Sequence, residues 1–89
     1  MKKEMIIKEA KNLVNITIEM HSNSLLGKEK MSTFIKKHID KKITYNEYNE
    51  ILHIYNRLLA ESGYEIKSDI RHFNIIDYNS KEYELYYNN

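Results

Sequence analysis

Residues 44–63 read TYNEYNEILHIYNRLLAESG, and this stretch carries the signals for both ends of a helix. Thr44 followed by Glu47 forms a capping box, in which each side chain accepts a hydrogen bond from the other residue's backbone amide. Gly63 stands where a helix commonly ends in a left-handed residue. Between these ends, apolar residues keep helical spacing for three turns, at Tyr48, Ile51, Leu52, Tyr55, Leu58 and Leu59. The stretch predicts a helix over residues 44–62.

A long helix is predicted before it, over residues 3–21. Helical spacing is carried there by Ile6, Ala10, Leu13, Val14 and Thr17. Residues 14–21 also alternate between apolar and polar, which is the pattern of a half-buried strand. No turn signal separates this part from the start of the helix, whereas HSNS at 21–24 is a clear break. We therefore favour one helix and keep the strand as the alternative.

A second helix is predicted over about 25–39, starting at Leu25 or Lys28. Its apolar positions are Met31, Phe34, Ile35, His38 and Ile39. Ser22 or Ser24 is a candidate N-cap, and Gly27 weakens the first turn.

The C-terminal part changes to a strand pattern, which predicts an antiparallel hairpin over about 70–87. Its strands are IRHFNIID at 70–77 and KEYELYY at 81–87, with a three-residue loop at 78–80. This register pairs Asp77 with Lys81, Ile75 with Tyr83 and Phe73 with Leu85, so that apolar side chains share one face. Asn79 is the loop residue that best tolerates a positive φ. The predicted fold class is α+β, with three helices followed by a C-terminal β-hairpin, in one domain over residues 1–89.

Composition excludes several classes of protein. The absence of cysteine rules out disulfides and zinc sites that need thiolates. The histidines do not have metal-binding spacing, and the two glycines form no phosphate loop, so no metal or cofactor is expected. No apolar run is long enough for a membrane span, and we expect a cytoplasmic protein. No nucleophile, base and orienting group are placed together, so an enzyme is not expected; a small ribonuclease using His53 or His72 with Arg57 or Arg71 ranks last.

Charge is unevenly distributed along the chain. Residues 1–42 hold ten lysines and five carboxylates, whereas residues 43–89 hold four basic residues and eight carboxylates. The lysines of 28–42 can neutralise phosphates or form an ordinary solvated helix face. The tyrosines all lie in the acidic half, where Tyr48, Tyr55 and Tyr83 suit a core, and Tyr86 and Tyr87 could stack on bases or on a protein.

The order of three helices and a hairpin resembles the winged helix-turn-helix domains found in small plasmid- and phage-encoded DNA-binding proteins. The resemblance implies that residues 28–39 and 44–62 are the two helices of the motif, that 40–43 is its turn, and that 77–81 is the tip of the wing. It implies that Tyr45, Asn46 and Asn49 face base edges. Glu47 and Glu50 oppose deep insertion of that helix, because carboxylates near phosphates are unfavourable.

The leading hypothesis is therefore a small DNA-binding regulator or accessory factor of a mobile element, which we expect to be dimeric. It binds double-stranded DNA mainly through lysines and the hairpin. The candidate nucleic-acid-binding residues are Lys28, Lys30, Lys36, Lys37, Lys41, Lys42, Tyr45, Asn46, Asn49, Lys67, Arg71, Asn79 and Lys81. The alternative is a protein-interaction module, such as a phage-type inhibitor or adaptor, with its partner on the tyrosine-rich C-terminal half.

Overall fold

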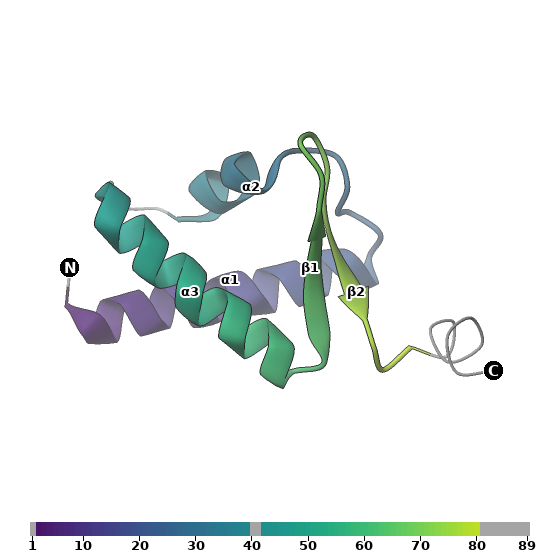
Figure 1. The fold of residues 1–89 in the computed structure, drawn as a ribbon, viewed down its shortest axis with the longest axis horizontal. Helices are drawn as coiled ribbons and strands as arrows, with labels where there is room; N and C mark the ends of the chain where they lie inside the picture. Colours follow the sequence, from purple (N-terminus) through teal and green to yellow (C-terminus); the bar gives the residue numbers. More distant parts are fainter. Residues whose placement is uncertain (1, 40–41, 81–89) are drawn as a thin grey trace.

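The fold consists of three helices followed by a two-stranded antiparallel sheet, an α+β arrangement as predicted (Figure 1). The computed structural model describes residues 2–39 and 42–80. Its helices are α1 (Lys3–Ser22), α2 (Met31–His38) and α3 (Tyr45–Glu61), and its strands are β1 (Tyr64–Ser68) and β2 (Phe73–Asp77). Helix α3 crosses α1, while α2 and the turn of the hairpin lie at the top of the view.

The pair of α1 and α3 forms the larger part of the core, and the sequence predicted both helices. Residues 14–21 are helical, so the alternative of a strand there is wrong. The residues that α1 buries are Ile6, Ala10, Leu13, Val14 and Thr17, the five that set its predicted apolar face. On α3, Ile51, Tyr55 and Leu59 are buried and belong to the same core. Periodicity identified these two helices because each has a continuous apolar face that packs against the rest of the core.

The two ends of α3 are formed as the capping signals predict. The Thr44 hydroxyl accepts from the Glu47 amide at 3.2 Å, and the Glu47 carboxylate accepts from the Thr44 amide at 2.8 Å. Gly63 follows the helix with a φ of +87°, a left-handed conformation that favours glycine. The chain therefore leaves α3 sharply and enters β1 at the next residue.

A buried hydrogen bond joins α1 to α3. The Thr17 hydroxyl donates to the Leu13 carbonyl oxygen at 2.6 Å, which uses its single hydrogen. The Tyr55 hydroxyl lies 2.6 Å from the Thr17 oxygen and must be the donor of that bond. Both side chains are fully buried. Burial raises the pKa of Tyr55, and the bond to Thr17 partly opposes this shift. Tyr55 is thus a large core residue whose polar end has one acceptor.

Helix α2 is shorter than predicted. It begins at Met31 and ends at His38, so residues 25–30 are not helical and Ile39 lies just beyond the helix. Its N-cap is Lys30, which makes no side-chain capping bond, and neither Ser22 nor Ser24 caps it. Ser24 and Gly27 instead adopt positive φ values of 57° and 90°. Phe34 and Ile35 are the residues that α2 buries, and Phe34 packs on Phe73 with 5.0 Å between ring centroids.

The hairpin differs most from its prediction. Strand β1 at 64–68 was not predicted, and residues 70–72 lie in the turn rather than in a strand. In the observed register Phe73 pairs with Ser68, Ile75 with Ile66 and Asp77 with Tyr64. The predicted partners Lys81, Tyr83 and Leu85 lie outside the described residues. Among the described residues other than glycine, Ser24 alone has a positive φ, so the expectation for Asn79 is wrong.

The bond between Thr17 and Tyr55 can be tested by a double-mutant cycle. Thr17→Val leaves the Tyr55 hydroxyl buried without its acceptor, which is expected to lower the free energy of unfolding by about 1–3 kcal/mol. Tyr55→Phe leaves Thr17 bonded to Leu13, and its cost is expected to be about 1 kcal/mol. The double variant has no buried hydroxyl without a partner, so its decrease in the free energy of unfolding should be smaller than the sum of the decreases in the two single variants. Urea unfolding monitored by circular dichroism measures each value.

Thr33→Val and Tyr45→Phe are matched controls, because they make the same chemical changes at exposed positions. Each is expected to change the free energy of unfolding by less than about 0.5 kcal/mol. The assignment of Tyr55 as donor to Thr17 is contradicted if Thr17→Val costs no more than Thr33→Val.

Candidate nucleic-acid interface

The loop before α2 is fastened to the hairpin by the backbone of one residue. The Gly27 amide donates to the Phe73 carbonyl oxygen, and the Phe73 amide donates to the Glu29 carbonyl oxygen, each at 2.9 Å. The positive φ of Gly27 and the nearby Asn74 side chain, 2.9 Å from where a Cβ would stand, favour glycine at this position. These bonds place Lys28 and Lys30 beside the end of the hairpin that carries the turn.

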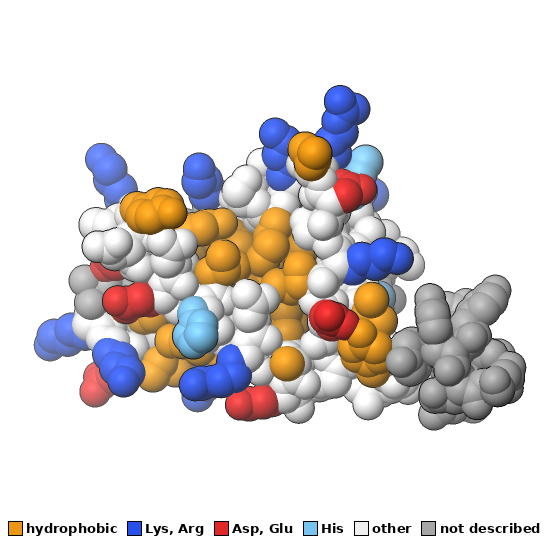
Figure 2. All heavy atoms as spheres, in the orientation of Figure 1, with side chains coloured by type: hydrophobic (Ala, Val, Ile, Leu, Met, Phe, Trp, Pro, Cys, Tyr) orange, Lys and Arg blue, Asp and Glu red, His pale blue; other side chains and the backbone are white. Residues whose placement is uncertain are grey.

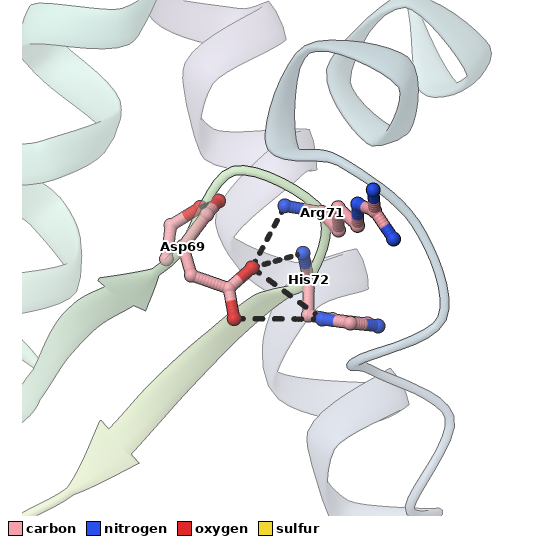
Figure 3. A network of polar contacts seen from close by, with 4 residues as sticks. Asp69, Arg71 and His72 are labelled. Atoms are coloured by element: carbon pink, nitrogen blue, oxygen red, sulfur yellow. Dashed lines mark hydrogen bonds and ion pairs between the residues drawn. The ribbon is translucent and has the colours of Figure 1, made fainter.

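The turn of the hairpin is held by the Asp69 carboxylate (Figure 3). One of its oxygens accepts from the Arg71 and His72 amides, each at 2.7 Å, and the His72 imidazole lies 3.4 Å from the other oxygen. The Asp69 amide in turn donates to the His72 carbonyl oxygen at 3.2 Å. The bonds to the Arg71 and His72 amides lower the pKa of Asp69. The carboxylate is thus occupied by the turn itself, while Figure 3 shows the Arg71 side chain extending away from it.

Basic side chains from three segments come together on one edge of the molecule. The loop 27–30, α2 and the hairpin turn lie along this edge (Figure 1), and Figure 2 shows lysine and arginine side chains projecting from it. We call it the basic edge; its exposed cations are Lys28, Lys30, Lys36, Lys37, Lys67 and Arg71. Within segments 27–38 and 67–73 the carboxylates are Glu29 and Asp69. The positive charge is therefore concentrated here, although the whole chain is close to neutral.

Lys37 makes an ion pair with a carboxylate of the same edge. Its Nζ atom lies 3.2 Å from an Oε atom of Glu29. The lysine side chain remains 62% exposed and the glutamate 26% exposed. An exposed pair of this kind contributes little to stability, and it leaves Lys37 reachable from solvent.

The predicted base-reading residues of α3 are all exposed, near the start of the helix. Tyr45, at 79% exposure, lines a hollow between α2 and α3 together with Lys36 and Tyr48. Asn49 lines a separate hollow between α1 and α3, beside Lys3 and Arg57. Asn46 is exposed in the first turn of α3. Of the three, Tyr45 is the one that the structure joins to the basic edge.

The remaining predicted residues are Asn79, Lys42, Lys41 and Lys81. Asn79 is at the base of the hairpin, where its side-chain amide donates to the Ser62 carbonyl oxygen at 3.4 Å. The tip of the described hairpin is formed by residues 69–72, at the end opposite Asn79, so the prediction of a tip at 77–81 does not hold for this hairpin. Lys42 is exposed in the segment before α3. Lys41 and Lys81 lie outside the described residues.

Sequence reasoning missed two residues of the turn, Asp69 and Ile70. An aspartate that bonds the amides two and three residues ahead is a recognised turn signal, and Asp69 in SDIR carried it. Ile70 follows it and is 84% exposed, although its predicted place was the first position of a strand. The turn was overlooked because it contains no glycine, proline or asparagine.

The described residues contain neither a metal-binding cluster nor a membrane-spanning helix. Within 2–39 and 42–80, no three histidine or acidic side chains are grouped so that they could hold a metal ion. In the same part of the chain, no helix has the length and apolar character needed to cross a membrane.

Comparison of the chain with protein-family models, with curated proteins and with solved structures gives no match.

The role of Asp69 in the turn predicts a response to pH. Because the folded pKa is lowered, the carboxylate's contribution is complete above its ordinary pKa of 3.8 and is lost as the pH falls below that value through the lower folded pKa. We expect the Arg71 and His72 amide resonances to titrate together with a midpoint below 3.8. A two-dimensional NMR titration measures this.

Asp69→Ala is expected to abolish that titration and to speed amide hydrogen exchange at Arg71 and His72 near neutral pH. Lys67→Ala is the control, since it shortens a side chain beside the turn and leaves both amide bonds in place. Unchanged exchange in Asp69→Ala would show that the carboxylate does not hold the turn.

Proposed function

We propose that this protein binds double-stranded DNA through the basic edge. The observation that carries the proposal is the convergence of exposed cations from three separate segments beside a protruding hairpin. Lysine and arginine side chains that neutralise phosphates supply most of the sequence-independent affinity for DNA. Segments 27–38 and 67–73 contain six such side chains and only two carboxylates. One of the carboxylates, Asp69, accepts hydrogen bonds from backbone amides of the turn.

The resemblance to winged helix-turn-helix domains rests on the order of three helices and a hairpin, and the position of the hairpin tip changes how the contacts are assigned. The hairpin is the candidate wing, and its tip is formed by residues 69–72. Arg71 lies in that tip, Lys67 lies on β1 just before it, and Lys28 and Lys30 stand beside it. Phosphate contacts are therefore assigned to the loop 27–30, α2 and the wing.

Helix α3 has a smaller part in this proposal than a recognition helix usually has. Its first turns carry Glu47 and Glu50, and the Glu47 carboxylate accepts from the Thr44 amide in the capping box. The negative charge of these residues repels phosphates, and removing Glu47 also weakens the start of the helix. Tyr45 is the α3 residue assigned to contact DNA, because its ring is exposed next to Lys36.

The proposal is tested by removing two lysines from the basic edge. In Lys28→Ala/Lys30→Ala, DNA affinity is expected to fall for every sequence tried. The slope of log K against log salt should also decrease by about 1 for each lysine that no longer neutralises a phosphate. Fluorescence anisotropy with a labelled duplex, repeated over a range of salt concentrations, measures both quantities.

Lys8→Ala/Lys11→Ala is the matched control. It removes the same charge from exposed positions on α1, away from the basic edge, and its affinity and salt slope should equal those of the unaltered protein. The proposal fails if the unaltered protein binds no DNA near physiological salt. It also fails if the two double variants weaken binding equally, because binding then depends on net charge and not on this edge.

A further inference from the structure

The most exposed large hydrophobic side chain among the described residues lies at the tip of the hairpin. Ile70 is 84% exposed, compared with 79% for Tyr45 and 45% for Leu25. It stands between Asp69 and Arg71 in the turn that joins β1 to β2. Figure 2 shows hydrophobic atoms at this outer end of the molecule, with lysine and arginine side chains close by.

The chain holds Ile70 in this position firmly. The Asp69 carboxylate accepts from the Arg71 and His72 amides, and the Asp69 amide donates to the His72 carbonyl oxygen, so both sides of Ile70 are fixed. Phe73, which begins β2, is bonded to the loop 27–29 and packs on Phe34. Turns of this kind usually carry polar residues or glycine, and a β-branched apolar residue facing water gains nothing from its exposure.

We propose that Ile70 is a wedge that enters the minor groove of DNA, partly separates two stacked base pairs and bends the duplex. This inference rests on the proposed function. Proteins that bend DNA from the minor groove insert isoleucine, leucine, phenylalanine or similar side chains between base steps. A wedge needs a narrow and rigid support, because the minor groove is only about 6 Å wide. The Ile70 side chain stands at the apex of a two-stranded hairpin, in a turn that the hydrogen bonds of Asp69 close.

The charges around Ile70 fit this geometry. Lys67 lies on β1 just before the turn and Arg71 follows Ile70 directly, so a cation stands on each side of the wedge. Both are exposed, and Lys28 and Lys30 lie next to them through the bonds of Phe73. With Ile70 between base pairs, these cations reach the phosphates that border the groove. The Asp69 carboxylate in the turn keeps its negative charge, and these four cations outnumber it.

Bending is measured by energy transfer between dyes on the two ends of a duplex of about 30 base pairs that contains TA steps, which kink readily. The unaltered protein is expected to bring the ends closer at saturation. Ile70→Ser should still bind, with the same dependence on salt, but should not shorten the distance between the ends. Lys67→Ala should keep the shortening at saturation and lower the salt slope by about 1.

Two controls accompany these variants. Ile70→Leu keeps an apolar wedge and should restore the shortening, and Leu25→Ser makes an equivalent change at another exposed apolar residue and should leave it intact. Circular dichroism of Ile70→Ser should match that of the unaltered protein, because the side chain lies outside the core. Binding to vesicles of phosphatidylcholine and phosphatidylserine is measured in parallel, since an apolar tip with basic neighbours also suits an anionic membrane surface.

The outcomes separate the two proposals. Binding to DNA without shortening, or equal shortening by Ile70→Ser, overturns the wedge and leaves the proposed function standing. Absence of DNA binding by the unaltered protein overturns both. Vesicle binding that depends on Ile70, together with unbent DNA, assigns the tip to membranes and overturns the wedge. Shortening that is absent in Ile70→Ser and present in Ile70→Leu supports it.

Discussion

The backbone of Phe73 is the joint on which the shape of the basic edge depends. Its amide and carbonyl groups bond to the loop before α2, and its ring packs on Phe34 of α2. Phe73 is also the first residue of β2 and pairs with the last residue of β1. One residue thus connects the loop, α2 and the hairpin, and the lysines of these three segments share a surface because of it.

Phe73 also belongs to the hydrophobic core, together with residues of α1, α2 and α3. Helices α1 and α3 bury their apolar faces in a common core and are tied to each other by the bond of Tyr55 to Thr17. Gly63 then turns the chain from α3 into β1, which sets the base of the hairpin against the end of that helix. The cations of the basic edge are exposed, so their charge can be changed without removing a core side chain.

The sequence was sufficient for the parts of the fold whose signals are local. The capping box, the glycine after α3 and the helical spacing of both long helices all involve residues within a few positions of each other. Residues 23–30 carry a break signal but no local signal for the path of the loop, because Gly27 and Glu29 bond to Phe73, which is distant in the sequence. Strand β1 was not predicted because Tyr64 and Ile66 are its only apolar residues. The turn after it was not predicted because an aspartate side chain forms it, and not a glycine or an asparagine.

In the candidate site, too, local features could be predicted from the sequence and long-range features could not. The number and spacing of the lysines in 28–42 predict that some of them are exposed. The sequence does not predict that Lys28 and Lys30 stand beside Lys67 and Arg71, because the long-range bonds of Phe73 bring them together. Ile70 was missed for a related reason: its apolar side chain was assigned to the start of a strand, whereas it lies in a turn and faces solvent.

The contact of Lys37 with Glu29 has a further consequence for how a polyanion would meet this surface. Glu29 acts as an internal counterion, so Lys37 has less need of a dissolved anion in the free protein. The Lys37 ammonium has three N–H donors and its side chain is 62% exposed, so a phosphate can bind it while Glu29 stays in contact. The Glu29 carboxylate then lies close to the bound phosphate and repels it. Lys37 therefore attracts a polyanion less strongly than a lysine without such a neighbour.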